Sequence, residues 1–504
     1  MKTILTLLLA LTTCASHVSA LELHALFTDN MMLQRDREIR VYGKASPGKQ
    51  VQASFAGNKA SATADQTGSF MIQLPAMNFT LEGQPLTVNS SEQTITLENV
   101  LVGDVWIGSG QSNMGWATRK TLNIPKDYPN AQIIRLFRGT KGVEADSPQD
   151  QFFPETGTYE SSWQEGSERY AGDISAVGYH FVRTVAAQTG IPQGLVVVAK
   201  SQTSIKQWTP PGTIDQLPEE FAAKYAPDAK LRKRDFNPAK AYKLYNGSMH
   251  PLTQFPIKGM VWYQAENDAQ DYDEYALYYP LAVKAWRAAW AQGDFPVFFV
   301  QLPGWPGEGP FQKAKAQTWP YQREAQEKAI AMPGVEMAVT VDLGSKALHP
   351  PVKGPIGERL ALHAIALEKP DTVVYGPVMK DIQRNGKTAT IRFESVGDGL
   401  RTQEVSLILA KAKSKNKPGE ILTIPAEPLA GFEICGADKV FYPAKAEIVG
   451  PDQVTLTAPA EVAKIEEIRY AFAPLPQCNL FNALGNPARP FRTDAFPFES
   501  TPVE

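Results

Sequence analysis

The feature that most constrains the fold is a series of short apolar segments that alternate with helical patterns between residues 101 and 375. The apolar segments are DVWIG, GLVVVAK, IKGMVWYQ, FPVFFVQL and EMAVTVDL, and helical patterns include 174–190 and 321–331. Continuous apolar strands that alternate with helices are typical of a parallel sheet covered by helices on both faces. We therefore predict an α/β fold for residues 101–375, arranged as an α/β/α sandwich.

The regions on either side of this unit have a different pattern. Short strand-like segments such as VQASF and SFMIQL are separated by turn sequences in residues 21–100, which predicts an N-terminal β-sandwich. Similar short segments predict a β-rich unit over residues 376–480, followed by a Pro-rich C-terminal tail, 481–504. A chain of 504 residues is long enough for several such domains.

The first twenty residues have the pattern of a cleaved secretory signal peptide. Lys2 precedes an apolar core, and Val18-Ser19-Ala20 provides a small-residue cleavage site. The alternative is a membrane anchor, but the apolar run is much shorter than the roughly 20 residues needed to span a bilayer. The pattern predicts a secreted or periplasmic protein with no membrane span. Cys435 and Cys478 then remain, either as a disulfide or as buried free thiols.

Composition restricts the partners and cofactors. The net charge is −3 and the isoelectric point about 6.2, so no basic field is available to attract nucleic acid. The sequence has no H-E-x-x-H motif and no CxxC pair, so we predict no metal and no cofactor. The sequence does not indicate an oligomeric state.

The stretch DVWIGSGQSNM contains the candidate nucleophile, Ser112. A strand is predicted over 104–107, and Gly108 and Gly110 then end it in a turn. Ser112 follows where a helix would begin, beside backbone N–H groups that stabilise negative charge. This placement suits a nucleophile and also an ordinary helix cap. The second glycine of the G-x-S-x-G elbow is missing, which disfavours an α/β-hydrolase.

A serine nucleophile needs a base, and the histidines provide few candidates. His180 and His363 fall in helical patterns, and His24 lies in the N-terminal β unit. His250 and His349 both lie in loops before proline, but only His349 follows a predicted strand of the central sheet. We therefore favour His349 as general base and interpret His250 as a structural loop residue.

A pair of adjacent acids offers a different chemistry. Asp273 and Glu274 suggest the two carboxylates of a glycosidase. Adjacent residues point in different directions on a regular element, so we favour an exposed helix start for this pair.

Several motifs together resemble those of the sialate O-acetylesterase-like members of the SGNH hydrolase superfamily. The motifs are GDVWIGSGQSNM, LYNGSMHPL followed by IKGMVWYQAEND, and VTVDLGSKALHP. Further similarity, in LFTDNMMLQRD, GADKVFYPAKAEI and NPARPFRTD, extends over nearly the whole chain after the signal peptide. The resemblance implies an SGNH-type α/β/α catalytic domain, with Ser112 as nucleophile and His349 as base. It also implies removal of acetyl groups from sugars through an acetyl-enzyme.

The resemblance also suggests additional site residues. Gln264 is a candidate side-chain donor to the oxyanion, with a packed structural amide as the alternative. Gln202 and Glu266 are further oxyanion or substrate candidates. Where the family has paired glycines, this chain has Ser201 and Gln202, and a positive φ angle would strain Gln202.

The chain departs from the family at two more positions. The acid that commonly precedes the histidine is missing, since Lys346 and Ala347 stand there. Asp342 or a backbone carbonyl would orient His349 instead, or a Ser-His dyad operates; we favour the dyad. The WYQGESN motif becomes WYQAEND, so the acyl pocket and the sugar side are expected to differ from those of sialate-specific members.

The expected function is hydrolysis of acetyl esters on a carbohydrate. The sugar is either a cell-wall polysaccharide such as xyloglucan or xylan, or sialic acid. The alternatives are a carbohydrate-binding protein whose catalytic site has decayed and a general short-chain carboxylesterase. Four tryptophans near the motifs are candidates for stacking on sugar rings, with core packing favoured for the third: Trp116, Trp208, Trp262 and Trp305.

Overall fold

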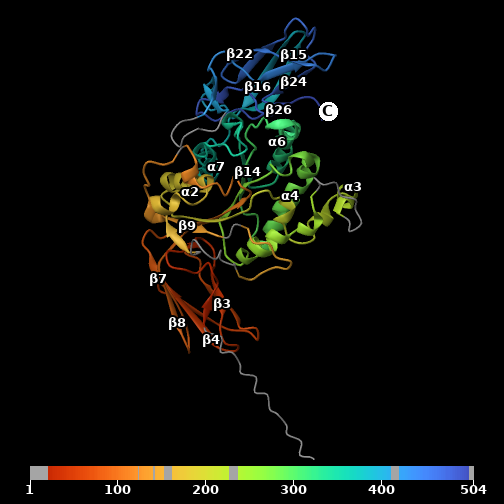
Figure 1. Cartoon of the computed structure of the whole chain (residues 1–504). Helices are drawn as coiled ribbons and strands as arrows, with labels where there is room; N and C mark the ends of the chain where they lie inside the picture. The colour runs from red at the N-terminus through yellow and green to blue at the C-terminus, as the bar shows by residue number, and fades with distance from the viewer. Residues whose placement is uncertain are drawn as a thin grey trace, which may run out of the picture.

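The computed structural model describes residues 21–122, 124–139, 142–151, 162–225, 236–409 and 419–498. It shows a β-rich unit at the N-terminal end, an α/β unit in the middle, and a second β-rich unit at the C-terminal end (Figure 1). The predicted signal peptide lies outside the described residues. No helix of the described part is long and apolar enough to cross a membrane.

A parallel sheet forms the centre of the middle unit. Its strands, in order across the sheet, are β10 (Trp163–Glu165), β9 (Ile134–Arg138), β11 (Gln193–Ala199), β8 (Thr94–Gly110), β12 (Gly259–Tyr263), β13 (Val297–Val300) and β14 (Val335–Ala338). Neighbouring strands are parallel except for β10, which pairs antiparallel with β9 at the edge. All five residues of β12 are buried, as expected for a sheet covered on both faces. The α/β prediction is confirmed.

Helices cover both faces of this sheet. On one face lie α2 (Ala176–Thr189) and α7 (Gly354–Ala366), and on the other α4 (Tyr272–Trp290) and α6 (Trp319–Glu327). Successive residues of β13 show the two faces: Phe298 contacts the His363 ring of α7, while Phe299 contacts Tyr279 of α4. Helices α2 and α6 occupy the two predicted helical segments. The Ser175 hydroxyl caps the start of α2, and Gly190 ends it with φ of 71°.

The order of the strands places β8 at a reversal point. After β8 the chain forms β9 and β11 on one side of it, and then forms β12, β13 and β14 on the other. In open α/β sheets, ligands bind beyond the carboxyl ends of the strands at such a point. The residues that follow Gly110 therefore occupy the favoured position for a site.

The smaller elements of the middle unit lie mainly in its loops. They are η1 (Thr118–Lys120), η2 (Ala131–Ile133), α1 (Glu168–Ala171), η3 (Ile205–Gln207), η4 (Ile214–Gln216), α3 (Glu219–Ala222), η5 (Ala223–Tyr225), η6 (Pro238–Lys240), η7 (Tyr245–Met249), η8 (His250–Leu252), η9 (Ala269–Asp271), α5 (Gly309–Ala316), η10 (Lys328–Ala331) and η11 (Val341–Leu343).

The N-terminal unit is joined to the middle unit by β8 itself. Its other strands are β1 (Glu22–Leu23), β2 (Met32–Gln34), β3 (Ile39–Lys44), β4 (Gln50–Phe55), β5 (Asn58–Thr63), β6 (Ser69–Leu74) and β7 (Gln84–Ser90). The first half of β8 pairs with β7, and the second half pairs with β11 and β12. One strand thus crosses the boundary that we placed at residue 100.

The C-terminal unit consists of small antiparallel sheets. Its strands are β15 (Val378–Asn385), β16 (Thr388–Glu394), β17 (Leu400–Thr402), β18 (Val405–Ile408), β19 (Ile421–Ile424), β20 (Phe432–Cys435), β21 (Phe441–Pro443), β22 (Lys445–Gly450), β23 (Gln453–Thr457), β24 (Glu467–Tyr470), β25 (Leu480–Asn482) and β26 (Phe491–Arg492). The last two strands pair with β17 and β24, so residues 481–498 are part of this unit and differ from the predicted tail. Cys435 and Cys478 are buried and free, as in the second of the two alternatives above.

Candidate active site

Ser112 lies in a tight turn directly after β8. Gly110 has φ of 131°, and a Cβ there would lie 2.2 Å from the Tyr263 carbonyl oxygen, so only glycine fits. The Gln111 N–H donates to the same Tyr263 oxygen at 3.0 Å. Met114 and Gly115 N–H then donate back to the Gln111 carbonyl, which closes the turn. Ser112 is therefore presented by a turn and not by the helix start that we expected.

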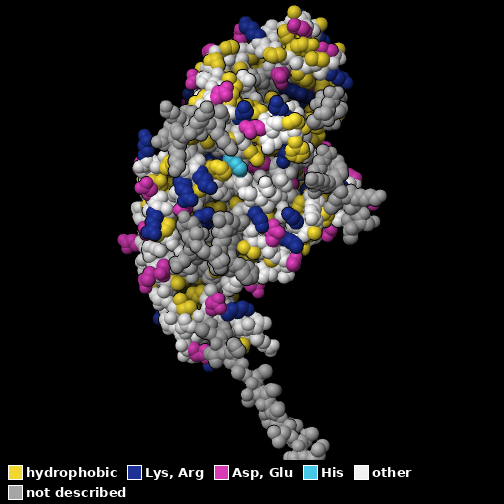
Figure 2. Space-filling model, in the orientation of Figure 1, with side chains coloured by type: hydrophobic (Ala, Val, Ile, Leu, Met, Phe, Trp, Pro, Cys, Tyr) yellow, Lys and Arg dark blue, Asp and Glu magenta, His cyan; other side chains and the backbone are white. Residues whose placement is uncertain are grey.

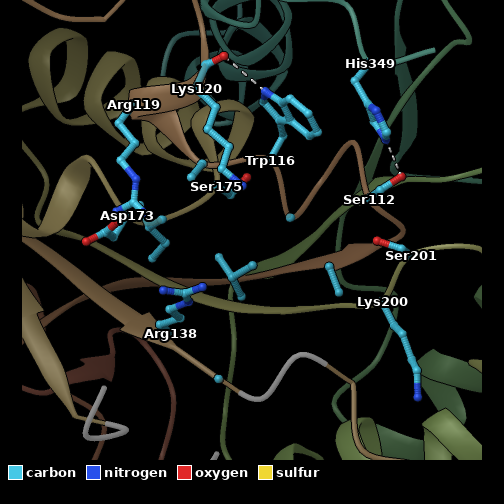
Figure 3. A pocket seen from close by; sticks show the side chains of 16 residues that line it. Ser112, Trp116, Arg119, Lys120, Arg138, Asp173, Ser175, Lys200, Ser201 and His349 are labelled. Atoms are coloured by element: carbon cyan, nitrogen blue, oxygen red, sulfur yellow. Dashed lines mark hydrogen bonds and ion pairs between the residues drawn. The ribbon is translucent and has the colours of Figure 1, made fainter. Parts of the chain in front are cut away.

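The structure brings the predicted base to the predicted nucleophile. The His349 Nε2 and Ser112 Oγ atoms are 2.8 Å apart and face each other (Figure 3). The Trp116 ring stacks on the His349 ring, with centroids 4.4 Å apart and planes 17° from parallel. A hydroxyl within hydrogen-bonding distance of an imidazole, with the ring held by stacking, is suitable geometry for proton transfer.

A buried polar network lies behind this pair. The Asn113 side-chain N–H₂ donates to Glu266 Oε1 at 2.5 Å and to the Leu348 carbonyl at 3.1 Å. The Lys353 ammonium donates to Asn113 Oδ1 and lies over the Tyr263 ring. We name the turn around Ser112, residues 110–115, the nucleophile turn. Asn113 thus joins this turn to Leu348, the residue before His349.

Burial controls the charges in this network. Desolvation lowers the pKa of Lys353 to about 7, although the nearby Glu266 carboxylate opposes this change. Desolvation also raises the pKa of Glu266, opposed by the hydrogen bond from Asn113 and the charge of Lys353. Burial therefore disfavours the charged forms of both Lys353 and Glu266. The neutral Asn113 side chain bridges the two groups.

Two of the proposed polar candidates are held in other contacts. The Gln264 side-chain N–H₂ donates to Asp268 Oδ2 at 2.7 Å and to the Thr203 carbonyl at 3.1 Å. Both of its N–H groups are thus engaged, which favours the structural alternative over an oxyanion donor. Asp342 accepts two hydrogen bonds from Arg359, at 2.6 and 2.7 Å. Its carboxylate is therefore paired with the Arg359 guanidinium.

Backbone geometry at the substituted glycine positions is unusual. Gln202 has φ of 60° and Ala265 has φ of 127°. Both values favour glycine, and the second is rare for any residue with a side chain. The chain therefore keeps the backbone shape that glycine normally allows, at a cost in strain.

A cavity of about 500 Å³ opens beside Ser112 and His349. Four of its lining residues are cationic: Arg119, Lys120, Arg138 and Lys200. Arg119 pairs with Asp173, and Lys200 pairs with Glu144 at 2.9 Å and points away from Ser112 (Figure 3). Lys and Arg side chains also lie on the central part of the face shown in Figure 2. The lining of the cavity thus includes several side chains with N–H donors.

Most of the remaining candidates are structural. Trp116 lines the cavity, whereas Trp208, Trp262 and Trp305 are buried in the core. Asp273 is exposed as expected, but Glu274 is buried and pairs with Lys206 at 2.8 Å, so the exposed interpretation was wrong for Glu274.

The other histidines do not join the site. Three histidines, His24, His180 and His363, are buried, and His250 Nδ1 lies 3.0 Å from the Gln149 carbonyl. The basic run KLRKR of the sequence, which we interpret as a solvated face, lies outside the described residues. Among the described residues, no group of His, Cys, Asp and Glu is arranged to hold a metal ion.

Sequence reasoning missed Asn113 and Lys353 as members of the site. Asn113 is adjacent to Ser112, and Lys353 follows His349 by four residues in HPPVKG. A lone lysine before a helix normally indicates a solvated surface, so only the structure shows that Lys353 is buried against Asn113.

Comparison with known proteins shows which family the chain resembles. Residues 102–365 match the family described as carbohydrate esterase, sialic acid-specific acetylesterase. The sialate O-acetylesterase of Rattus norvegicus is 25% identical, with 80% of each chain covered, and that of Homo sapiens is 24% identical, with 92% of this chain and 90% of the human protein covered.

A solved structure extends the similarity. A novel carbohydrate acetylesterase from Xanthomonas citri is 30% identical and superimposes with a TM-score of 0.77, covering 94% of this chain and all of that one. The fold, the cavity and these matches define the class of the protein, an esterase. More narrowly, the chain belongs to the family of carbohydrate esterases described as sialic acid-specific acetylesterases, and it acts on acetylated carbohydrate.

Proposed function

We propose that this protein removes acetyl groups from a carbohydrate with Ser112 as nucleophile and His349 as general base. The observation that carries the proposal is the 2.8 Å contact between Ser112 Oγ and His349 Nε2 at the edge of the cavity. On the resemblance of its motifs, we assign the α/β unit to the SGNH type. A dyad supported by the Asn113 network is favoured over a triad with Asp342.

The reaction has two steps. His349 takes the Ser112 proton as Oγ attacks the acetyl carbonyl carbon, and the resulting oxyanion accepts a hydrogen bond from the Ser112 backbone N–H. The C–O bond to the sugar then breaks, and the imidazolium gives its proton to the leaving sugar hydroxyl. Water, activated by His349, attacks the acetyl-enzyme and releases acetate, which restores Ser112.

The cavity lining suggests how the sugar is held. The exposed side of Trp116 offers an apolar wall next to the reacting ester. Arg138 and Lys120 line the same cavity and have N–H donors for sugar hydroxyls or for a carboxylate. Replacement of Arg138 by Gln separates these roles: KM rises for sialic acid alone if the arginine binds a carboxylate, and for neutral polysaccharides as well if it binds hydroxyls.

The test is acetate release from acetylated xyloglucan, acetylated xylan and O-acetyl sialic acid. We expect wild type to release acetate from at least one of them and Ser112→Ala to release none. Ser61→Ala, which removes an exposed serine of the N-terminal unit, is the matched control and is expected to keep full activity. Binding of a sugar without acetate release would favour the carbohydrate-binding alternative. Preference for longer acyl chains on simple esters would favour the general carboxylesterase.

We also propose that the protein is exported after cleavage behind Ala20. The support is the pattern of the first twenty residues. N-terminal sequencing of protein recovered from the periplasm or the medium tests this, and Met1 at the N-terminus of the recovered protein would contradict it.

A further inference from the structure

We infer that the C-terminal β unit positions the catalytic base, with Ser345 and Leu475 as positioning residues. The inference rests on the proposed function, because it concerns the geometry of His349. It gives a catalytic task to a unit that otherwise resembles an appended β-domain. The segment concerned is 344–349, which we name the base loop.

Hydrogen bonds attach the base loop to strand β18 of the C-terminal unit. The Lys346 N–H donates to the Ile408 carbonyl at 2.9 Å, and the Ser345 hydroxyl donates to the same oxygen at 3.0 Å. The Ser345 hydroxyl also accepts from the Ala347 N–H at 3.1 Å. One buried side chain thus fixes the shape of the base loop and ties it to the neighbouring unit.

An apolar contact supports the start of the same loop. A Cβ on Gly344 would lie 2.5 Å from the Leu475 side chain, and one on Gly304 would lie 2.8 Å from it. Leu475 therefore packs closely against the backbone of both glycines. Leu475 is partly buried and also packs against a small core of the C-terminal unit, formed by Val405, Leu407, Ile424 and Phe481. Leu475 thus connects the start of the base loop, at Gly344, to this core.

The middle α/β unit, which we call the catalytic unit from here on, holds the other end of the base loop. Asn113 donates to the Leu348 carbonyl, and His349 meets Ser112 immediately afterwards. Lys346 and Leu348 are themselves exposed, so contacts of their side chains with a protein interior do not fix the loop. Its position is therefore set by anchors on two different units.

This arrangement matters because proton transfer is sensitive to distance. Displacement of a catalytic group by about 1 Å can reduce the rate about 100-fold without preventing substrate binding. Loosening the anchors on the C-terminal unit should therefore lower kcat more than it changes KM. A purely stabilising contact would lower the melting temperature and leave kcat of the folded enzyme unchanged.

The test compares Leu475→Ala and Ser345→Ala with Leu456→Ala in the full chain. Leu456 lies in β23, is fully buried and belongs to the C-terminal unit, so its truncation removes at least as much packing from the same unit without touching the base loop. We expect both loop variants to lose about 10- to 100-fold in kcat, with KM within about twofold of wild type. Leu456→Ala should lower the melting temperature and keep kcat.

Two results would overturn the inference. One is wild-type kcat in both loop variants, and the other is an equal loss of kcat in Leu456→Ala. Ser345→Ala removes only an oxygen, so it remains informative if Leu475→Ala does not fold. An inactive wild type would instead contradict the proposed function, which keeps the two failures distinguishable.

Discussion

The nucleophile turn and the base loop meet at one hydrogen bond but are built in different ways. The turn around Ser112 is formed by residues next to it in sequence and by the adjacent strand β12, through the Tyr263 carbonyl. The base loop is held by Ile408 and Leu475 of the C-terminal unit and by Asn113 of the catalytic unit. The proposed nucleophile is thus positioned by the sheet and its adjacent turn, whereas the position of the proposed base depends on residues that are distant in the chain.

We expect the largest effect from replacing either member of the Ser112–His349 pair. Ser112→Ala and His349→Ala should each reduce kcat by at least about 1,000-fold, because attack needs both the hydroxyl and the group that takes its proton. The double variant should be no worse than either single one, since the two residues act as a unit. Steady-state acetate release measures this, and full additivity of the two losses would contradict a shared step.

The next effect tests the network that joins the two regions. Lys353→Met leaves the buried Asn113 Oδ1 without its donor and Glu266 without the nearby lysine, which should cost about 1 to 3 kcal/mol in the free energy of unfolding. Adding Glu266→Gln should recover part of this loss, because the unpaired charge is removed. Urea unfolding of both variants measures it, and a double variant that is less stable than Lys353→Met would contradict the coupling.

Acid should lower the free energy of unfolding through His363 in α7, the helix that follows the base loop. Burial lowers the pKa of His363 in this helix to about 4, from an ordinary value of 6.5. Between pH 6.5 and 4 the unfolded chain binds more protons than the folded one, so the free energy of unfolding falls as pH falls. This histidine contributes a loss of about 3 kcal/mol over that window.

The variant that checks this effect is His363→Gln, with the free energy of unfolding measured from pH 7 to pH 4. We expect a shallower dependence on pH than in wild type, whatever the change in stability at pH 7. An unchanged slope would show that His363 does not carry the effect. His24 has its pKa lowered in the same way, also by burial, so some dependence on pH should remain.

The smallest expected effect is a gain in the free energy of unfolding from a substitution at Ala265, on the Ser112 side of the site. Ala265, which follows β12 closely, has φ of 127°, and glycine adopts this angle without strain. Ala265→Gly should therefore raise the free energy of unfolding by about 1 kcal/mol, after the greater entropy of glycine in the unfolded chain is included. Thermal and urea unfolding measure it, with Gln202→Gly as a second case. A loss of stability at both positions would show that the strain is offset by contacts of their side chains.

Local patterns were enough to predict most of the catalytic unit. The apolar segments found in sequence became β8, β11, β12, β13 and β14 because strands buried on both faces need continuous apolar residues. Ser112 and His349 could be singled out because each follows such a strand. Gln264 shows the limit of this reasoning: its motif suggested an oxyanion donor, but its N–H groups bind Asp268 and Thr203. Motifs identify polar residues and do not tell which partners they meet.

From the sequence alone we could predict the α/β class and the strand ends where a site is expected, and we could select Ser112 and His349 as the proposed nucleophile and base. Those features follow from the periodicity of side chains and the placement of glycines, which act over a few residues. The burial of Lys353 and Glu266 behind the site, and the contacts of Ser345 and Leu475 that join the base loop to the C-terminal unit, became visible only in the folded chain. Burial and hydrogen bonding between residues far apart in sequence depend on how the whole chain packs, and no local pattern contains them.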